Sequence, residues 1–229
     1  PELGLAQPGL TIVCPDSHTC TQGGVGALAW GIGSTEGEHA LATQTLAVRR
    51  PKSMRVTFDG ALGTGVTPKD MILHLIGRYT AAGGAGHVVE FAGSAVEALS
   101  IEGRLTLCNM AVEFAAWTGL CAPDQKTLDY LRGRPLAPQG GAWDHAAADW
   151  LSLRSDPDAV YDTEIRIDAA EIAPTITWGA SPQHAVPITG RVPDPASFED
   201  PQRRAGAEAA LAYMDLQPGA PLIGLPIQA

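Results

Sequence analysis

The alternation of strand-type and helix-type segments constrains the fold of this chain more than any other feature. Apolar runs at residues 10–14, 53–58 and 87–91 are typical of short strands, and segments with helix signals separate them. Strands separated by helices pair in parallel, because each helix carries the chain back to the edge where the next strand begins. The sequence therefore predicts an α/β protein with mainly parallel sheets.

Capping chemistry marks the best-defined helix. Thr67 is a favoured N-cap and Pro68 suits the first helical position, so we expect a helix from residue 68 that stops at Gly83–Gly84. Thr35 is the expected N-cap of an earlier helix over residues 36–46. Further helices are expected at residues 104–120, 123–131, 143–153 and 201–214, with a strand at 163–167 and an irregular, proline-rich segment at 173–197.

The overall charge and the cysteine content exclude several classes of protein. The formal net charge of the 229-residue chain is −10, whereas a nucleic-acid-binding protein needs a basic face for the phosphates. No apolar run approaches the ~20 residues that a membrane-spanning helix needs. The four cysteines contain no C-x-x-C pair and are sparse for this length, which favours a reduced, cytoplasmic protein.

The stretch VCPDSHTCTQGG, residues 13–24, is the strongest candidate for a site. It places Asp16, Ser17 and His18 in a polar turn directly after an expected strand, where α/β proteins place functional residues. Neighbouring side chains of an extended stretch point to opposite faces, and no G-x-S-x-G sequence surrounds the serine, so the three do not form a hydrolase triad together. A site and an ordinary hydrogen-bonded turn are both compatible with this pattern.

A second candidate lies in the apolar segment 104–120, which contains Glu113 and, four residues earlier, Asn109. A buried carboxylate is costly unless it is paired, so we expect Glu113 to have a histidine or arginine partner. On one helix the two residues would share a face and form the wall of a site. The alternative is that Glu113 lies on the solvent-exposed side of that helix.

Two other patterns carry weaker signals. The glycines of QGGVGALAWGIG lack the G-x-G-x-x-G spacing and a Walker lysine, so we interpret them as positions of close backbone packing. The cysteines lack both the close pairs of zinc sites and the clustered run of iron–sulfur sites, so we expect buried thiols that bind no metal. They are Cys14, Cys20, Cys108 and Cys121.

Several long stretches together resemble the aconitase superfamily, and within it the large subunits of 3-isopropylmalate dehydratases. They are VCPDSHTCTQGGVGALAWGIGSTEGEHALATQTL, GVTPKDMILHLIG, GHVVEFAGSAVEALSIEGRLTLCNMAVEFAAWTGLCAPDQKTLDYLRGRP, TWGASPQHAVPITGRVPDP and ALAYMDLQPG. The resemblance covers essentially the whole chain and implies a three-layer αβα fold with mainly parallel sheets. Residues 1–50 would end one α/β domain, residues 51–135 would form a second, and residues 136–229 would connect to a third.

The resemblance also implies an activity. It implies a hydro-lyase that interconverts 2-isopropylmalate and 3-isopropylmalate in leucine biosynthesis, by removing water and adding it back. In this family a [4Fe-4S] cluster acts as Lewis acid on a small dicarboxylate, and a separate small subunit completes a heterodimer or heterotetramer. The chemistry further needs a base for a C–H proton and an acid for the departing hydroxyl.

The family pattern assigns roles to the candidate residues. The resemblance implies catalytic roles for Asp16, His18 and Glu113, with Glu113 as the partner of His18. It implies a substrate contact for Ser17 and a place beside the cluster for Asn109. It places no metal ligand in this chain, because the cluster cysteines, the histidine partner of Asp16 and the catalytic serine are expected outside it.

The chain differs from the complete family pattern in two ways. Pro15 stands where the family usually has glycine, and proline removes an N–H group on the approach to Asp16. Because the cluster cysteines are expected elsewhere, we interpret the chain as the central segment of a large subunit, inactive by itself and prone to self-association. The alternatives are a related hydro-lyase acting on homoaconitate, dimethylmalate or a methylcitrate-type substrate, and a truncated scaffold without catalytic function.

Overall fold

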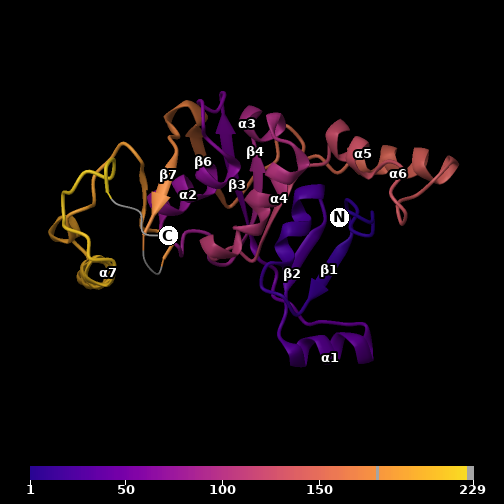
Figure 1. Cartoon of the computed structure of the whole chain (residues 1–229). Helices are drawn as coiled ribbons and strands as arrows, with labels where there is room; N and C mark the ends of the chain where they lie inside the picture. The colour runs from indigo at the N-terminus through magenta and orange to yellow at the C-terminus, as the bar shows by residue number, and fades with distance from the viewer. Residues whose placement is uncertain (179–180, 226–229) are drawn as a thin grey trace.

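The computed structural model describes residues 1–178 and 181–225, which form three sheets with helices around them (Figure 1). The strands are β1 (Thr11–Cys14), β2 (Leu28–Gly31), β3 (Lys52–Asp59), β4 (His87–Ala92), β5 (Thr118–Cys121), β6 (Thr163–Asp168), β7 (Thr175–Thr177) and β8 (Ala185–Pro187). The α-helices are α1 (Ser34–Thr43), α2 (Pro68–Tyr79), α3 (Ser94–Ala98), α4 (Ile101–Asn109), α5 (Gln125–Leu131), α6 (Gly141–Leu151) and α7 (Pro201–Tyr213). Short 3-10 helices are η1 (Thr19–Val25), η2 (Val112–Phe114), η3 (Ala169–Glu171) and η4 (Pro195–Ser197).

The central sheet has the strand order β5–β4–β3–β6, and every neighbouring pair in it is parallel. Val56 of β3 lies beside Phe91 of β4 on one side and beside Ile165 of β6 on the other. The strands β1 and β2 also pair in parallel, whereas β7 and β8 form a small antiparallel pair. The prediction of an α/β protein with mainly parallel sheets is therefore confirmed.

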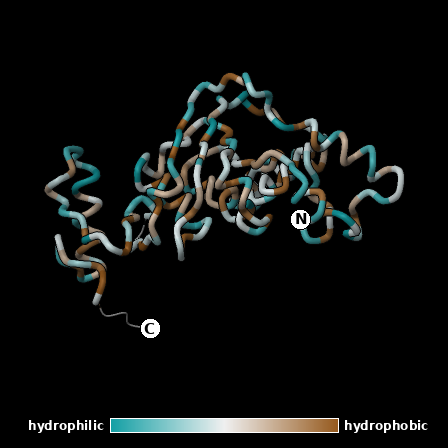
Figure 2. Tube along the Cα trace, turned by 90° about the horizontal axis from the view of Figure 1, so that it is seen from above, coloured by the Kyte–Doolittle hydropathy of each residue, from teal (hydrophilic) through white to brown (hydrophobic). Residues whose placement is uncertain are grey.

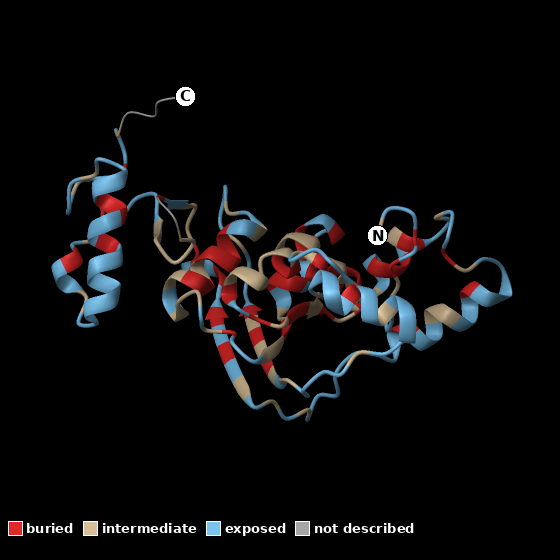
Figure 3. Ribbon diagram, turned by 90° about the horizontal axis from the view of Figure 1, so that it is seen from below, coloured by how far each residue is buried: buried red, intermediate tan, exposed pale blue. Residues whose placement is uncertain are grey.

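The two faces of the central sheet differ in polarity. Val56 and Phe58 of β3 point to a face that packs against α2 and α4 and forms the largest apolar core (Figure 3). On the opposite face, Glu90 of β4 accepts hydrogen bonds from Ser155 (2.7 Å) and Tyr161 (2.6 Å), which belong to the segment between α6 and β6. The helices α2 and α4 thus lie together on the apolar side, and the candidate site forms between them and η1.

Close backbone packing joins η1 to the rest of the molecule. Gly23 lies so near the carbonyl of Gly119 in β5 that a Cβ atom would overlap it, and a Cβ at Gly24 would lie 2.6 Å from the N atom of Leu105 in α4. The Thr118 hydroxyl donates a hydrogen bond to the carbonyl of Ala29 in β2. The interpretation of these two glycines as positions of close backbone packing is confirmed.

The prediction of one helix over residues 104–120 is wrong. The helix α4 ends at Asn109, η2 forms one turn over Val112–Phe114, and Ala115 then turns the chain with a φ of 60° before β5 begins. A continuous apolar run does not distinguish a buried helix from a helix followed by a buried strand. Asn109 and Glu113 consequently do not share a helical face, and Glu113 lies in the turn after the helix.

Other elements differ from expectation by smaller amounts. The helix α1 begins two residues early, because the Glu36 carboxylate accepts a hydrogen bond from the N–H of Gly33 (2.8 Å), which makes Gly33 the N-cap in place of Thr35. The helix α2 begins after Thr67 as expected but ends at Tyr79. The pattern gave no indication of β2, which lies inside the glycine-rich stretch, or of β7 and β8.

Two helical regions lie outside the main core. Trp143 and Trp150 of α6 pack edge to face with ring centroids 5.6 Å apart, in a small cluster shared with α5. Trp178 and Leu211 belong to a separate cluster beside α7. Seen from above, both regions project from the ends of the molecule (Figure 2). The three expected domain ranges stay a prediction.

Among residues 1–178 and 181–225, no helix is both long enough and apolar enough to cross a membrane.

Candidate active site

The polar turn after β1 is held by its own hydrogen bonds. The Asp16 carboxylate accepts one from the N–H of His18 (2.7 Å), and the Thr19 hydroxyl donates one to the Asp16 carbonyl (2.7 Å). The turn leads into η1, which is fixed against α4 and β5. Asp16 and Ser17 remain exposed on this turn, so their side chains are accessible to a ligand.

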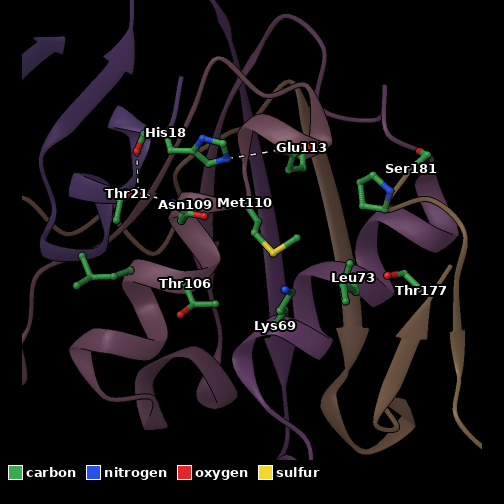
Figure 4. Close-up of a pocket in the computed structure, with 12 residues that line it drawn as sticks. His18, Thr21, Lys69, Leu73, Thr106, Asn109, Met110, Glu113, Thr177 and Ser181 are labelled. Atoms are coloured by element: carbon green, nitrogen blue, oxygen red, sulfur yellow. Dashed lines mark hydrogen bonds and ion pairs between the residues drawn. The ribbon is translucent and has the colours of Figure 1, made fainter. Parts of the chain in front are cut away.

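His18 and Glu113 meet across the junction of η1 and η2. The distance from His18 Nε2 to Glu113 Oε1 is 3.4 Å, and the two side chains are 40% and 43% exposed (Figure 4). The contact that the family resemblance implies is therefore present. Glu113 is half exposed, so the prediction that it is a buried charge in need of a partner is wrong.

Both ring nitrogens of His18 have a neighbour. Ser17 Oγ lies 3.0 Å from Nδ1, on the other side of the ring from Glu113. A carboxylate accepts hydrogen bonds and has no proton to donate, so the contact with Glu113 favours the tautomer with hydrogen on Nε2. In that tautomer Nδ1 carries the free lone pair and accepts a hydrogen bond from Ser17.

Asn109 is positioned by the end of α4. Its side-chain Nδ2 donates a hydrogen bond to the Thr21 hydroxyl (2.9 Å), and its carbonyl accepts one from the Cys20 thiol (3.4 Å). Both contacts go to η1, so the same packing that fixes the polar turn also fixes Asn109. Asn109 and Glu113 are thus joined by a turn of the chain and do not lie along one helix.

Asn109, His18 and Glu113 line a common pocket with a volume of about 590 Å³ (Figure 4). Its wall also includes hydroxyl groups and apolar side chains from α2, α4 and the segment after β7. The other lining residues are Thr21, Lys69, Leu73, Leu105, Thr106, Met110, Thr177, Ser181 and Pro182. The pocket therefore combines an imidazole–carboxylate contact with hydrogen-bond donors, which suits a small polar ligand.

Asp16 and Ser17 line a different hollow, of about 900 Å³, on the other side of the turn. Arg49 and Arg50, from the segment between α1 and β3, lie in its wall together with Trp117. The structure therefore brings together three of the five candidate residues in one pocket and places the other two in the neighbouring hollow. His18 and Ser17 connect the two through the 3.0 Å contact described above.

The cysteines of this chain do not form a ligand set for a metal or an iron–sulfur cluster. Within the ranges 1–178 and 181–225, no group of three or more His, Cys, Asp or Glu side chains is arranged to hold a metal ion. Cys108 and Cys121 face each other in the core with their sulfur atoms 3.8 Å apart. Burial raises the pKa of the Cys108 thiol well above its ordinary value and also raises the pKa of Cys20, which disfavours the thiolate that a metal needs.

Sequence reasoning did not single out several pocket residues. Lys69 follows the Thr67–Pro68 cap signal, and Thr21 lies three residues after His18, but neither position has a distinctive pattern. Arg49 and Arg50 form the one adjacent arginine pair in the first half of the chain. That pair was a usable signal for the second hollow.

Comparison with known proteins identifies the family of this chain. The sequence model of the aconitase family, described as aconitate hydratase, matches residues 1–229. This chain belongs to the aconitase family. Among curated members of this family, the chain is 61% identical over 224 residues to "3-isopropylmalate dehydratase large subunit 1" of Bradyrhizobium diazoefficiens. The match covers 98% of this chain and 47% of that protein, so the chain spans about half the length of this relative.

Proposed function

We propose that this chain forms part of the large subunit of a 3-isopropylmalate dehydratase. The enzyme would be a hydro-lyase that interconverts 2-isopropylmalate and 3-isopropylmalate by loss and return of water. The observation that carries this proposal is the 61% identity, over nearly the whole chain, to a relative of that name. A role in leucine biosynthesis and a cytoplasmic location belong to the same proposal.

In the proposed reaction His18 exchanges a proton with the substrate at Nδ1, where the substrate takes the place of the Ser17 hydroxyl as hydrogen-bond partner. Glu113 lies against Nε2 and keeps hydrogen on that atom, which leaves the lone pair on Nδ1. When the ring takes up a proton, the negative charge of Glu113 compensates the positive imidazolium. A ring oriented in this way can act as the acid for a departing hydroxyl group and as the base for its return.

The other candidate residues receive supporting roles in this proposal. Ser17 contacts the substrate, since its hydroxyl lies 3.0 Å from the nitrogen that exchanges the proton. Asp16 acts as the carboxylate of a second carboxylate–histidine pair, whose histidine lies outside this chain. Asn109 lies beside the cofactor, and its hydrogen bond to Thr21 orients the amide.

We further propose a [4Fe-4S] cluster and a small-subunit partner for the complete protein. The cysteines of this chain do not fit the ligand positions, so the cluster ligands would come from the remainder of the large subunit. The substrate would be a small dicarboxylate bound between the large and the small subunit. In this proposal the present segment supplies acid–base residues, and the remainder of the large subunit holds the cluster.

The test is an assay of the full-length large subunit, purified with its small subunit and a reconstituted cluster. We expect the complex to turn over 3-isopropylmalate and to discriminate against homoaconitate, methylcitrate and dimethylmalate. Preferred turnover of one of those three compounds would replace the proposed substrate. Absence of turnover on all four, with the cluster intact, would overturn the proposed activity.

A further inference from the structure

We propose that Lys69 is a substrate-binding residue, whose ammonium group pairs with one carboxylate of the dicarboxylate. This inference rests on the proposed function. It adds a residue at the start of α2 to a site whose other candidate residues lie in the turn after β1, at the end of α4 and in η2.

Lys69 projects from the first turn of α2 into the wall of the 590 Å³ pocket. Figure 4 shows its side chain directed toward Met110. His18, Glu113 and Asn109 line the same pocket from the turn before η1, from η2 and from the end of α4. A ligand that fills the pocket would therefore contact both the imidazole and the ammonium group.

The charge balance of the pocket favours an anionic ligand beside Lys69. Among the residues that the structure describes there, Lys69 is the only lining side chain with a permanent positive charge, and Glu113 is the only carboxylate. Glu113 is engaged with His18. The chain as a whole carries a net charge of −10, so a dicarboxylate needs such a local cation in order to approach.

The ammonium group of Lys69 has no polar partner in the described part of the chain. It takes part in none of the ion pairs and side-chain hydrogen bonds found within residues 1–178 and 181–225. Lys126 is different, because its Nζ donates to three carbonyl groups at the end of α3, at 2.6, 2.8 and 3.1 Å. Lys126 is thus a structural lysine, whereas Lys69 is free to bind a ligand.

The neighbouring acid does not neutralise Lys69. One oxygen of Asp70 accepts hydrogen bonds from the N–H (2.7 Å) and the hydroxyl (2.6 Å) of Thr67, and the other accepts one from the N–H of Thr175 (2.7 Å). Both oxygens of Asp70 are therefore already hydrogen-bonded, one to the N-cap residue of α2 and the other to β7. The same bonds fix the backbone that carries Lys69, so a carboxylate would have to order only its exposed side chain.

The experiment measures binding of a substrate analogue that cannot react, in the full-length complex with its small subunit. The probe is 2-isopropylsuccinate, which keeps both carboxylates and lacks the hydroxyl group. Its two monoamides each lose one of the carboxylate charges. Dissociation constants are measured by calorimetry for the wild type, Lys69→Met and Lys69→Arg, with Lys52→Met as the matched control at an exposed lysine outside the pocket.

We expect Lys69→Met to weaken binding of the diacid roughly tenfold to hundredfold, because a charge-assisted hydrogen bond is lost. One of the two monoamides should bind the wild type as weakly as the diacid binds Lys69→Met, and the substitution should not weaken that monoamide further. Lys69→Arg should recover part of the affinity, and Lys52→Met should leave all three constants unchanged.

Two results would overturn the inference. One is unchanged binding of the diacid to Lys69→Met. The other is an equal loss for the diacid and both monoamides, which would indicate a structural effect without contact to a carboxylate. The proposed function is judged separately, because it depends on turnover of 3-isopropylmalate by the wild-type complex, whereas these constants are measured without turnover.

Discussion

The junction of η1 with α4 and β5 and the outlying helix α7 are built in opposite ways. At the junction, backbone packs directly on backbone, as at Gly23 and Gly119, and the residues in contact are about a hundred positions apart in the chain. In α7 a Cβ added at Gly206 would meet no atom within 4 Å, and only three residues of the helix are buried. This difference shows which contacts position the residues of the candidate site. His18 and Glu113 meet because the junction is tight, and α7 is not needed for that contact.

Of the substitutions in these two regions, Gly23→Ala should have the largest effect on stability. A methyl group in place of its hydrogen would overlap the Gly119 carbonyl, so β5 or η1 must move. We expect Gly23→Ala to destabilise the full-length protein by more than about 4 kcal/mol or to prevent folding. Urea unfolding followed by circular dichroism, or the yield of soluble protein where folding fails, measures this. A loss of less than about 1 kcal/mol would show that the junction is looser than described.

The next effect concerns the buried ion pair behind the junction. Arg104 of α4 is 2% exposed, and its Nη2 lies 2.5 Å from Asp124, the N-cap of α5. Removing one partner leaves the other charge buried, so we expect Asp124→Asn to cost about 3 kcal/mol of the free energy of unfolding. Asp129→Asn, at an exposed carboxylate of the same helix, serves as the comparison for α5.

The same pair predicts a dependence on pH. Burial by itself would raise the pKa of Asp124, but the hydrogen bond and charge of Arg104 outweigh it and hold that pKa below its usual value. A carboxyl group with a lowered folded-state pKa stabilises the protein above its unfolded-state pKa, and that stabilisation is lost as the pH falls through the folded-state value. Stability should therefore fall in this acidic range in the wild type, and less steeply in Asp124→Asn. Parallel pH profiles would contradict the assignment.

The smallest expected effect is of opposite sign and lies in α7. Glycine inside a helix loses more conformational freedom on folding than alanine, and Gly206 has open space around it. We expect Gly206→Ala to stabilise the protein by about 0.5–1 kcal/mol, measured by the same urea titration. A destabilisation comparable to that of Gly23→Ala would remove the contrast between the two regions.

Local chemistry allowed parts of this fold to be predicted from the sequence. Thr67 and Asp70 cap α2 as their spacing predicts, because capping depends only on neighbouring residues. The strand β2 and the break after Asn109 could not be predicted, because both depend on the backbone contacts that η1 makes with distant segments. In the segment 104–120, tertiary contact decided between a helix and a strand where the apolar pattern favoured neither.

The candidate site shows the same division. The position of Asp16, Ser17 and His18 at the end of a strand follows from the local pattern, and so does their exclusion as a triad. The contact between His18 and Glu113 came from the family resemblance, since the burial argument for Glu113 was wrong. Lys69 was not predicted, because nothing in the local sequence shows that the first turn of α2 faces the same pocket.

A double-mutant cycle in the full-length complex shows whether His18 and Glu113 act as one unit. The rate of 3-isopropylmalate turnover is measured for His18→Gln, Glu113→Gln and the double variant, with cluster content checked in each. We predict that each single variant loses a factor on the order of 10² or more, and that the double variant is no slower than the slower single one. Losses that multiply in the double variant would show that the two side chains act independently and would contradict the account.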